Sequence, residues 1–293
     1  MKEQSNESIA LKVSLVTIIG NVILTVFKLI AGFVGHSSAM ISDAIHSGSD
    51  VLSTLVVIVG VKLSNKKSDI EHPYGHERLE CVAAIILAIM LAVTGAGIGI
   101  SGINMMFQDN TVIPVPSTIA LVAAIISIIV KEAMYWYTYF PAKKMNSGAL
   151  LADAWHHRSD ALSSIGSFAG ILGAQLGFKF LDPLASVVIS LFILKVSYDI
   201  FKDSINKMID KSCDKDVIQE IEDIIYRNGS VKQIDDLKTR LFGDKIYVDV
   251  EIAADADLTL LESHQVAQDI HDLIEKSVPL VKHCMIHMNP YIK

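Results

Sequence analysis

Six long apolar segments occupy the first two thirds of the chain. They lie at about residues 10–34, 38–63, 79–107, 112–137, 148–177 and 180–202. An α-helix needs about 20 predominantly apolar residues to cross about 30 Å of hydrocarbon, and each segment is at least that long. Residues 1–9 are polar, and the first segment is longer than the apolar core of a cleavable signal peptide. The pattern therefore predicts a polytopic α-helical membrane protein, with a short N-terminal segment at residues 1–9 and six transmembrane helices at residues 10–203.

The pattern after residue 203 is typical of a small water-soluble domain. Apolar residues recur at helical spacing within residues 213–230, and a second helical pattern covers about residues 258–276. Residues 231–243 and 245–253 read as two strands joined by turn residues, and a last strand at residues 281–290 is expected to stop at Pro290. The order α-β-β-α-β predicts an α+β domain at residues 204–293, with helices on one face of a small sheet. Dimer formation is expected to support so small a core.

Composition and charge agree with this division. The 293 residues are 51% hydrophobic and 19% charged, which is too apolar for an ordinary soluble enzyme. The net charge is −7, and from residue 203 onward 18 acidic residues stand against 11 basic ones, so the whole net charge lies in the C-terminal part. A negative domain argues against nucleic-acid binding and favours the gathering of cations. The three cysteines form no CxxC motif, so neither a disulfide framework nor a thiolate metal site is predicted.

Basic residues in the connecting loops predict the orientation in the membrane. They gather after the second and fourth apolar segments, at Lys62, Lys66, Lys67, Arg78, Lys143 and Lys144. Cytoplasmic loops carry an excess of lysine and arginine, so these loops are expected to be cytoplasmic. Both chain termini are then cytoplasmic as well.

A polar motif is repeated inside two of the apolar segments. The stretch SDAIHSGSDVLST at residues 42–54 overlays on ADAWHHRSDALSS at residues 152–164, so that His46 matches His156 and Asp50 matches Asp160. An ionisable side chain within a membrane costs about 2.5–3.5 kcal/mol, so it persists where it meets a partner, a cavity or an ion. The spacing i, i+4 places each pair on one helix face. Two such faces brought together offer two imidazoles and two carboxylates, a tetrahedral set that suits Zn²⁺ and tolerates similar divalent ions.

The alternative is that each aspartate and histidine only makes a polar contact between helices. Two independent packing solutions have no reason to reproduce the same residues at the same spacing, so the duplication favours one metal site built from two helices. Asp43 and Asp153 lie one turn nearer the start of each helix and are either supporting or purely structural. Lys131 and Glu132 in the fourth segment are expected to pair with each other.

A second group of ligand-type residues lies in the loop DIEHPYGHERLE at residues 69–80. Asp69, His72 and His76 fall within eight positions of one another. The alternative interpretation of the same residues is a Pro-Gly turn that exposes two histidines.

With its paired HxxxD motifs and this loop, the chain resembles the cation diffusion facilitator family of divalent-metal exporters. The resemblance covers nearly the whole chain and implies a homodimer of six-span subunits with a ferredoxin-like, metallochaperone-like cytoplasmic domain for metal sensing and dimerisation. It implies a transport site at His46, Asp50, His156 and Asp160, and a loop metal site at Asp69, His72 and His76. In the C-terminal domain it suggests Asp235, Asp249, His264 and His287 as ligands, with Asn289 where an aspartate is common. Ordinary surface charge on an acidic domain is the alternative there.

The expected function is efflux of a divalent cation, foremost Zn²⁺ in exchange for H⁺, by alternating access and without an organic cofactor. Mn²⁺, Fe²⁺, Cd²⁺ and Co²⁺ are further expected substrates, and an Mn²⁺ or Fe²⁺ exporter of the same family is the first alternative. The chain is expected in the lipid bilayer of a bacterial inner or plasma membrane, as a transporter rather than an enzyme. A sensor that does not transport and an intramembrane metallohydrolase are further alternatives, although the sequence has no HExxH motif.

Overall fold

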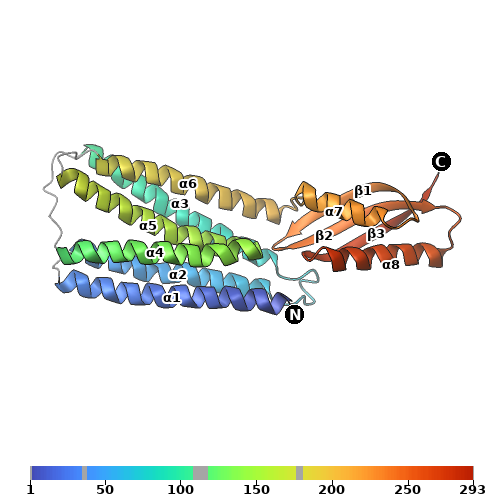
Figure 1. Ribbon diagram of the computed structural model, residues 1–293, viewed down its shortest axis with the longest axis horizontal. Coiled ribbons are helices and arrows are strands. Elements are labelled where there is room, and N and C mark those ends of the chain that lie inside the picture. Colours follow the sequence, from blue (N-terminus) through green and yellow to red (C-terminus); the bar gives the residue numbers. More distant parts are fainter. Residues whose placement is uncertain (1, 35–37, 108–117, 176–180, 293) are drawn as a thin grey trace. The chain divides into compact units, whose positions relative to one another are not determined.

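Figure 1 shows the computed structural model, which describes residues 2–34, 38–107, 118–175 and 181–292. The chain divides into two compact units, Met1–Ser204 and Ile205–Lys293. Each unit has its own apolar core and is described by itself. Within the described residues, the first unit consists of six long helices: α1 (Lys2–Val34), α2 (Ser38–Ser64), α3 (Arg78–Phe107), α4 (Thr118–Met145), α5 (Gly148–Gln175) and α6 (Leu181–Met208), the last of which crosses the boundary.

The helices of the first unit lie side by side, roughly parallel to one another (Figure 1). Helix α2 packs against α1, α3 and α5, and α4 packs against α1 and α5. Small residues let these helices approach closely. A Cβ atom built on Gly60 of α2 would lie 2.4 Å from the Cβ of Ala83 on α3, which is closer than two non-bonded carbon atoms can come. The α2–α3 contact therefore depends on glycine at position 60.

The outer surface of this unit is apolar. Exposed side chains include Ile23 on α1, Val93 on α3, Ile129 on α4 and Leu191 on α6. An apolar exterior over several long helices suits a lipid environment better than water. Among the described residues, two helical stretches are long and apolar enough to cross a membrane, Ser8–Ala31 and Arg78–Asn104. Helices α2, α4 and α5 carry ionisable residues in their middle turns, which lowers their mean hydropathy.

The second unit is a three-stranded sheet with two helices. Its elements follow the predicted order: α7 (Lys215–Tyr226), β1 (Val231–Phe242), β2 (Lys245–Asp255), α8 (Leu260–Ser277) and β3 (Val281–Tyr291). The strands lie in the order β1-β2-β3, with β1 antiparallel and β3 parallel to β2. Apolar side chains of both helices pack with those of β2, among them Ile221, Ile274 and Val250. The periodicity of the sequence predicted the order of these elements correctly.

Two details of this unit concern its edge strand and the start of its second helix. The prediction that Pro290 stops the last strand is wrong, because β3 continues through it to Tyr291. Strand β3 is an edge strand of the sheet, and an edge tolerates a residue without an N–H group. Helix α8 begins with a capping box, in which Thr259 and Glu262 each accept a hydrogen bond from the other's backbone N–H.

Candidate metal centres

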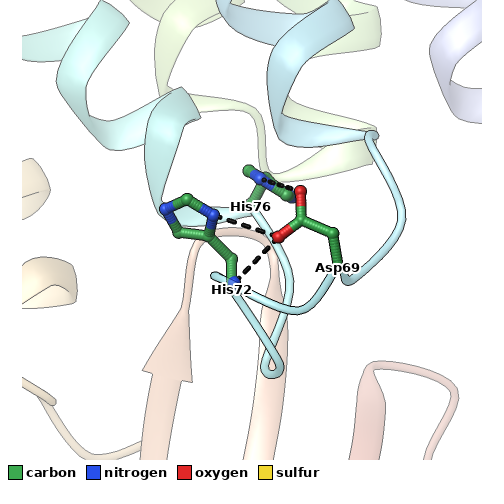
Figure 2. A group of neighbouring side chains, drawn as sticks. All are labelled: Asp69, His72 and His76. Atoms are coloured by element: carbon green, nitrogen blue, oxygen red, sulfur yellow. Dashed lines mark hydrogen bonds and ion pairs between the residues drawn. The ribbon is translucent and has the colours of Figure 1, made fainter.

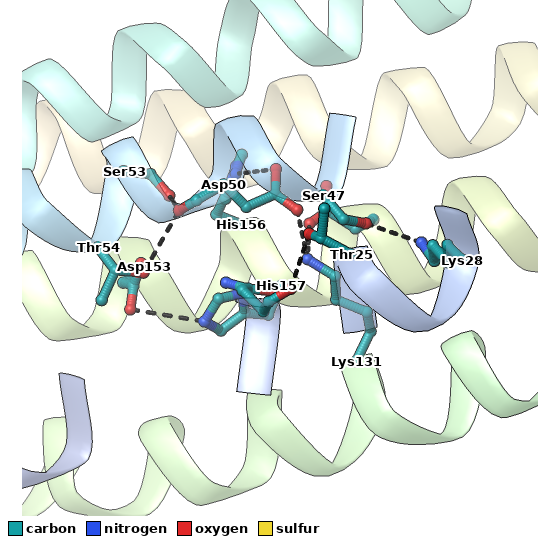
Figure 3. Close-up of polar contacts among 12 residues, drawn as sticks. Thr25, Lys28, Ser47, Asp50, Ser53, Thr54, Lys131, Asp153, His156 and His157 are labelled. Carbon is teal, nitrogen blue, oxygen red and sulfur yellow. Dashed lines mark hydrogen bonds and ion pairs between the residues drawn. The ribbon is translucent and has the colours of Figure 1, made fainter. Parts of the chain in front are cut away.

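The two repeated motifs meet in the interior of the helical unit (Figure 3). Asp50 comes from α2, and His156 and Asp160 come from neighbouring turns of α5. All three side chains are buried, and their ligand atoms lie within 4.8 Å of one another. His156 Nε2 lies 3.4 Å from Asp50 Oδ1. In a tetrahedral site with bonds of about 2.0 Å, neighbouring ligand atoms stand about 3.3 Å apart, so this separation is one that a single ion can bridge.

Three of the four residues predicted for this site are therefore brought together. The fourth, His46, lies on α2 one turn before Asp50, but its side chain is outside the described residues, as is that of Asp43. The pairing of α2 with α5 agrees with the expectation that the two motifs face each other.

A lysine lies between the two carboxylates, which the sequence analysis did not anticipate. Lys131 of α4 donates hydrogen bonds to Asp50 Oδ2 at 2.5 Å and to Asp160 Oδ2 at 2.9 Å. Only 2% of this lysine side chain is exposed. The site thus already pairs its carboxylates with one fixed positive charge. A divalent ion that uses the same oxygens has to compete with this ammonium group.

The predicted pair between Lys131 and Glu132 is wrong. Glu132 Oε1 instead accepts a hydrogen bond from Trp136 Nε1 at 3.0 Å and lies 3.6 Å from Arg158. Adjacent residues of a helix point about 100° apart, so the two charges face different sides of α4. This geometry was the signal in the sequence that could have assigned Lys131 to the interior.

The polar network extends beyond these carboxylates. Asp153 Oδ1 accepts a hydrogen bond from Thr54 Oγ1 of α2 at 3.2 Å, and Asp153 Oδ2 lies 3.6 Å from His157 Nε2. Asp153 and His157 are fully buried. Between α1 and α2, buried Lys28 Nζ donates a hydrogen bond to Ser47 Oγ at 2.8 Å (Figure 3). Asp153 therefore links α5 to α2 without belonging to the group of ligand atoms around Asp50.

The loop before α3 brings its three predicted residues together (Figure 2). His72 Nδ1 lies 3.2 Å from Asp69 Oδ1, and His76 Nε2 lies 3.5 Å from Asp69 Oδ2. His76 is buried, whereas His72 is exposed. The alternative of a turn with two exposed histidines therefore fits His72 only.

Hydrogen bonds hold this loop in a state that suits cation binding. Lys66 Nζ donates to Asp69 Oδ2 at 2.7 Å, and the His72 backbone N–H donates to Asp69 Oδ1 at 2.8 Å. These bonds, the lysine first, hold the pKa of Asp69 well below its usual range, so its carboxylate stays ionised. His76 Nδ1 lies 3.3 Å from the Lys66 carbonyl oxygen, which only accepts hydrogen bonds. Nδ1 therefore carries a proton, and Nε2, which holds a lone pair in the neutral ring, faces Asp69.

The four residues suggested in the C-terminal unit do not converge within one chain. Asp249 alternates with buried Val248 and Val250 on β2, so it lies on the face of the sheet away from the helices. His264 is exposed on α8, which packs against the other face. Among the described residues, Asp235, Asp249, His264 and His287 form no group of three with ligand atoms within 4.8 Å. Asp235 Oδ2 instead accepts a hydrogen bond from Asn289 Nδ2 at 2.8 Å.

Comparisons with known proteins agree with this division of the chain. Residues 14–209 match the family described as the cation efflux transmembrane domain, and residues 213–291 match the cytoplasmic domain of cation efflux proteins. The chain is similar to the manganese efflux system protein MneP of Bacillus subtilis (strain 168), with 34% identity over 98% of each chain. It is also similar to MneS of the same organism, with 34% identity over 94% of each chain. The magnetosome protein MamB of Magnetospira sp. (strain QH-2) is 33% identical over 92% of each chain.

Proposed function

The chain belongs to the cation diffusion facilitator family of divalent-metal efflux proteins, and from this premise we propose that it exports Zn²⁺ from the cytoplasm in exchange for protons. The observation that carries the proposal is the convergence of Asp50, His156 and Asp160, from two helices, in the buried interior of the helical unit. We place His46 in the same site because its motif repeats that of His156. Two imidazoles and two carboxylates make a borderline ligand set that suits Zn²⁺.

Lys131 stabilises the metal-free state of the transport cycle. In the absence of metal its ammonium group neutralises one of the two charges of Asp50 and Asp160, so the site does not bury a bare pair of carboxylates. An entering Zn²⁺ takes the carboxylate oxygens and displaces the ammonium group. When the site faces the other side of the membrane, the return of the ammonium group to the carboxylates favours release of the ion. The lysine thus lowers the affinity of the site and prevents the ion from becoming trapped.

Proton exchange follows from the histidine ligands. Metal binds only to a deprotonated imidazole nitrogen, so His156 holds either a proton or the metal at Nε2. A proton that enters from the outside occupies this nitrogen and drives the metal off. Alternating access then couples the two cations, since each conformation exchanges with one side of the membrane only. In this scheme α1–α6 all span the bilayer and both termini are cytoplasmic.

The remaining metal groups are assigned to cytoplasmic roles. Asp69, His72 and His76 offer a second site in the loop, which captures metal before it enters the transport path. The C-terminal domain forms the contact of a homodimer, as its small core favours. Since Asp235, Asp249, His264 and His287 do not converge within one chain, a site built from them takes ligands from both chains.

Mn²⁺ is the second candidate substrate. The relatives MneP and MneS are named as manganese efflux proteins, and two of the three described transport ligands are carboxylates, which suit Mn²⁺. Zinc is preferred on the ligand chemistry, because the imidazole of His156, joined by His46, suits Zn²⁺ better than the oxygen-preferring Mn²⁺.

Flux into proteoliposomes tests the proposal. Zn²⁺, Mn²⁺, Fe²⁺, Cd²⁺ and Co²⁺ are compared with and without a pH gradient, for the wild type, His156→Ala and the control Lys195→Ala, which alters an exposed lysine of α6. Zinc flux that rises with the pH gradient, falls at least tenfold in His156→Ala and persists in the control is the expected result. Manganese flux above zinc flux would assign the second substrate, and metal flux independent of the pH gradient would contradict proton exchange.

A further inference from the structure

A third group of metal-ligating side chains lies in the C-terminal unit and has no part in the proposed transport. His271 and Glu275 stand one turn apart on α8, and His283 lies near the start of β3, the strand beside that helix (Figure 1). Glu275 Oε1 is 3.2 Å from His271 Nε2 and 3.5 Å from His283 Nδ1. The three ligand atoms lie within 4.8 Å of one another, and all three side chains are partly exposed.

Hydrogen bonds to the backbone fix the direction of the His271 lone pair. His271 Nδ1 lies 2.6 Å from the carbonyl oxygen of Cys284, which only accepts hydrogen bonds, so Nδ1 is the protonated nitrogen. In the neutral ring, Nε2 then has a lone pair that faces the carboxylate of Glu275 at 3.2 Å. A proton or a metal ion at Nε2 makes this contact attractive. A backbone carbonyl that holds the distal nitrogen is also the usual support of a histidine metal ligand.

Protection of the sheet edge explains part of this arrangement and leaves the rest unexplained. Strand β3 is an edge strand, and α8 satisfies both backbone groups of Cys284, because Glu275 Oε1 accepts from its N–H group at 3.2 Å. That role accounts for His271 and Glu275. It gives no reason for His283 to approach the same carboxylate oxygen, so that two imidazole nitrogens and one carboxylate oxygen gather at one place.

We propose that His271, Glu275 and His283 bind a divalent transition-metal ion that joins α8 to β3. The separations of 3.2 and 3.5 Å match the spacing of about 3.3 Å between neighbouring ligands of a tetrahedral ion. Two imidazoles and one carboxylate select Zn²⁺, Co²⁺ or Ni²⁺ over Mn²⁺ and Mg²⁺, and water completes the coordination. The site is contained in one chain and differs in every ligand from the group at Asp235, Asp249, His264 and His287. Its partly exposed ligands exchange ions directly with solvent.

Metal binding by the full-length protein tests the site without reference to transport. The background is the full chain carrying Asp160→Asn, which weakens the transport site and leaves the C-terminal unit unchanged. Glu275→Gln removes a ligand charge, while its amide oxygen still accepts from the Cys284 N–H group. His283→Ala removes a ligand that the sheet edge does not need. Gln268→Ala, an exposed position of the same helix, is the matched control.

Bound metal per chain is measured by equilibrium dialysis against Zn²⁺ at pH 7.5, and the visible absorption of added Co²⁺ reports the coordination. Both ligand variants are expected to lose about one equivalent of Zn²⁺ and the matching part of the Co²⁺ spectrum, whereas Gln268→Ala keeps both. Circular dichroism of the metal-free proteins is expected to be the same for all variants. Equal zinc content in the background, His283→Ala and Glu275→Gln would overturn the proposal, as would an equal loss in Gln268→Ala. Because the readouts are bound zinc and the Co²⁺ spectrum and not metal flux, neither result depends on the transport proposal.

Discussion

Replacement of Lys131 by methionine is expected to tighten zinc binding at the proposed transport site and to slow zinc release. Methionine keeps the length of the side chain and removes its charge. At an effective dielectric constant of about 20, ion pairs at 2.5 and 2.9 Å are each worth about 6 kcal/mol before desolvation is subtracted. Breaking such a buried pair costs about 3–5 kcal/mol in net terms. In the wild type, zinc binding has to break these ion pairs, and the cost is subtracted from the binding free energy. In Lys131→Met there is no ion pair to break, so the cost is absent.

The lower end of that range, about 3 kcal/mol, corresponds to an increase in zinc affinity on the order of 100-fold. The assay is a competition titration of the full-length protein in detergent against a chromophoric zinc chelator. Lys131→Arg keeps the charge and is expected to bind zinc about as weakly as the wild type, and Lys195→Ala controls for loss of an exposed lysine. In proteoliposomes, Lys131→Met is expected to bind zinc but to turn over slowly. A folded Lys131→Met protein with wild-type or weaker zinc affinity would refute the idea that lysine and metal compete for the same oxygens.

Three further substitutions test other parts of the structure. Gly60→Val forces α2 away from Ala83 and is expected to cost about 1–3 kcal/mol, seen as a lower thermal unfolding temperature in detergent; an unchanged temperature would contradict the close contact. Thr259→Ala removes the capping box and is expected to cost about 1 kcal/mol and to speed amide exchange in the first turn of α8, but not in α7. Asp69→Asn is expected to loosen its loop at pH 7 and also at pH 5, because a carboxylate with a lowered pKa keeps its stabilising effect until the pH falls below its unfolded value of about 3.9. Limited proteolysis of the loop measures this, and a difference between wild type and variant that vanishes by pH 5 would contradict it.

Much of the fold was predictable because helices and strands have characteristic spacings of apolar residues, which can be read from the sequence. The six apolar stretches predicted the helices α1–α6, and the alternation along residues 245–253 predicted β2. The turn at Gly243 was also predictable, since its positive φ of 66° is a conformation that glycine adopts without strain. The strand end at Pro290 was predicted wrongly, because only the strand order reveals that β3 lies at an edge.

The candidate sites were predictable where ligands lie close in sequence or are repeated. His156 and Asp160 share a helix face by spacing alone, and the repeat supplied their partner Asp50. Lys131 was missed because its contacts with Asp50 and Asp160 span 81 and 29 residues, so they depend on how α4 packs against α2 and α5.

The same limit applies in the C-terminal unit. The pair His271 and Glu275 has helical i, i+4 spacing, but nothing in the sequence shows that His283 lies beside them until α8 is docked along β3. Conversely, Asp249 and His264 both have ligand chemistry, yet the sheet places them on opposite faces. The residue type shows which side chains can bind a metal, whereas the packing of helices and strands decides which of them lie close together.

The energetics of the buried charges support the proposed role in moving an ion better than a role in stability. Asp50, Lys131 and Asp160 are each at least about nine-tenths buried, and each charge costs about 2.5–3.5 kcal/mol in a membrane interior before pairing offsets it. Apolar residues of similar volume often stabilise a protein as well as, or better than, a buried ion triad does. A bundle selected for stability alone would therefore fill this space with leucine and methionine. A site that has to hold a cation briefly and then let it go needs carboxylates to attract the ion, and it needs a tethered cation of its own to take the ion's place.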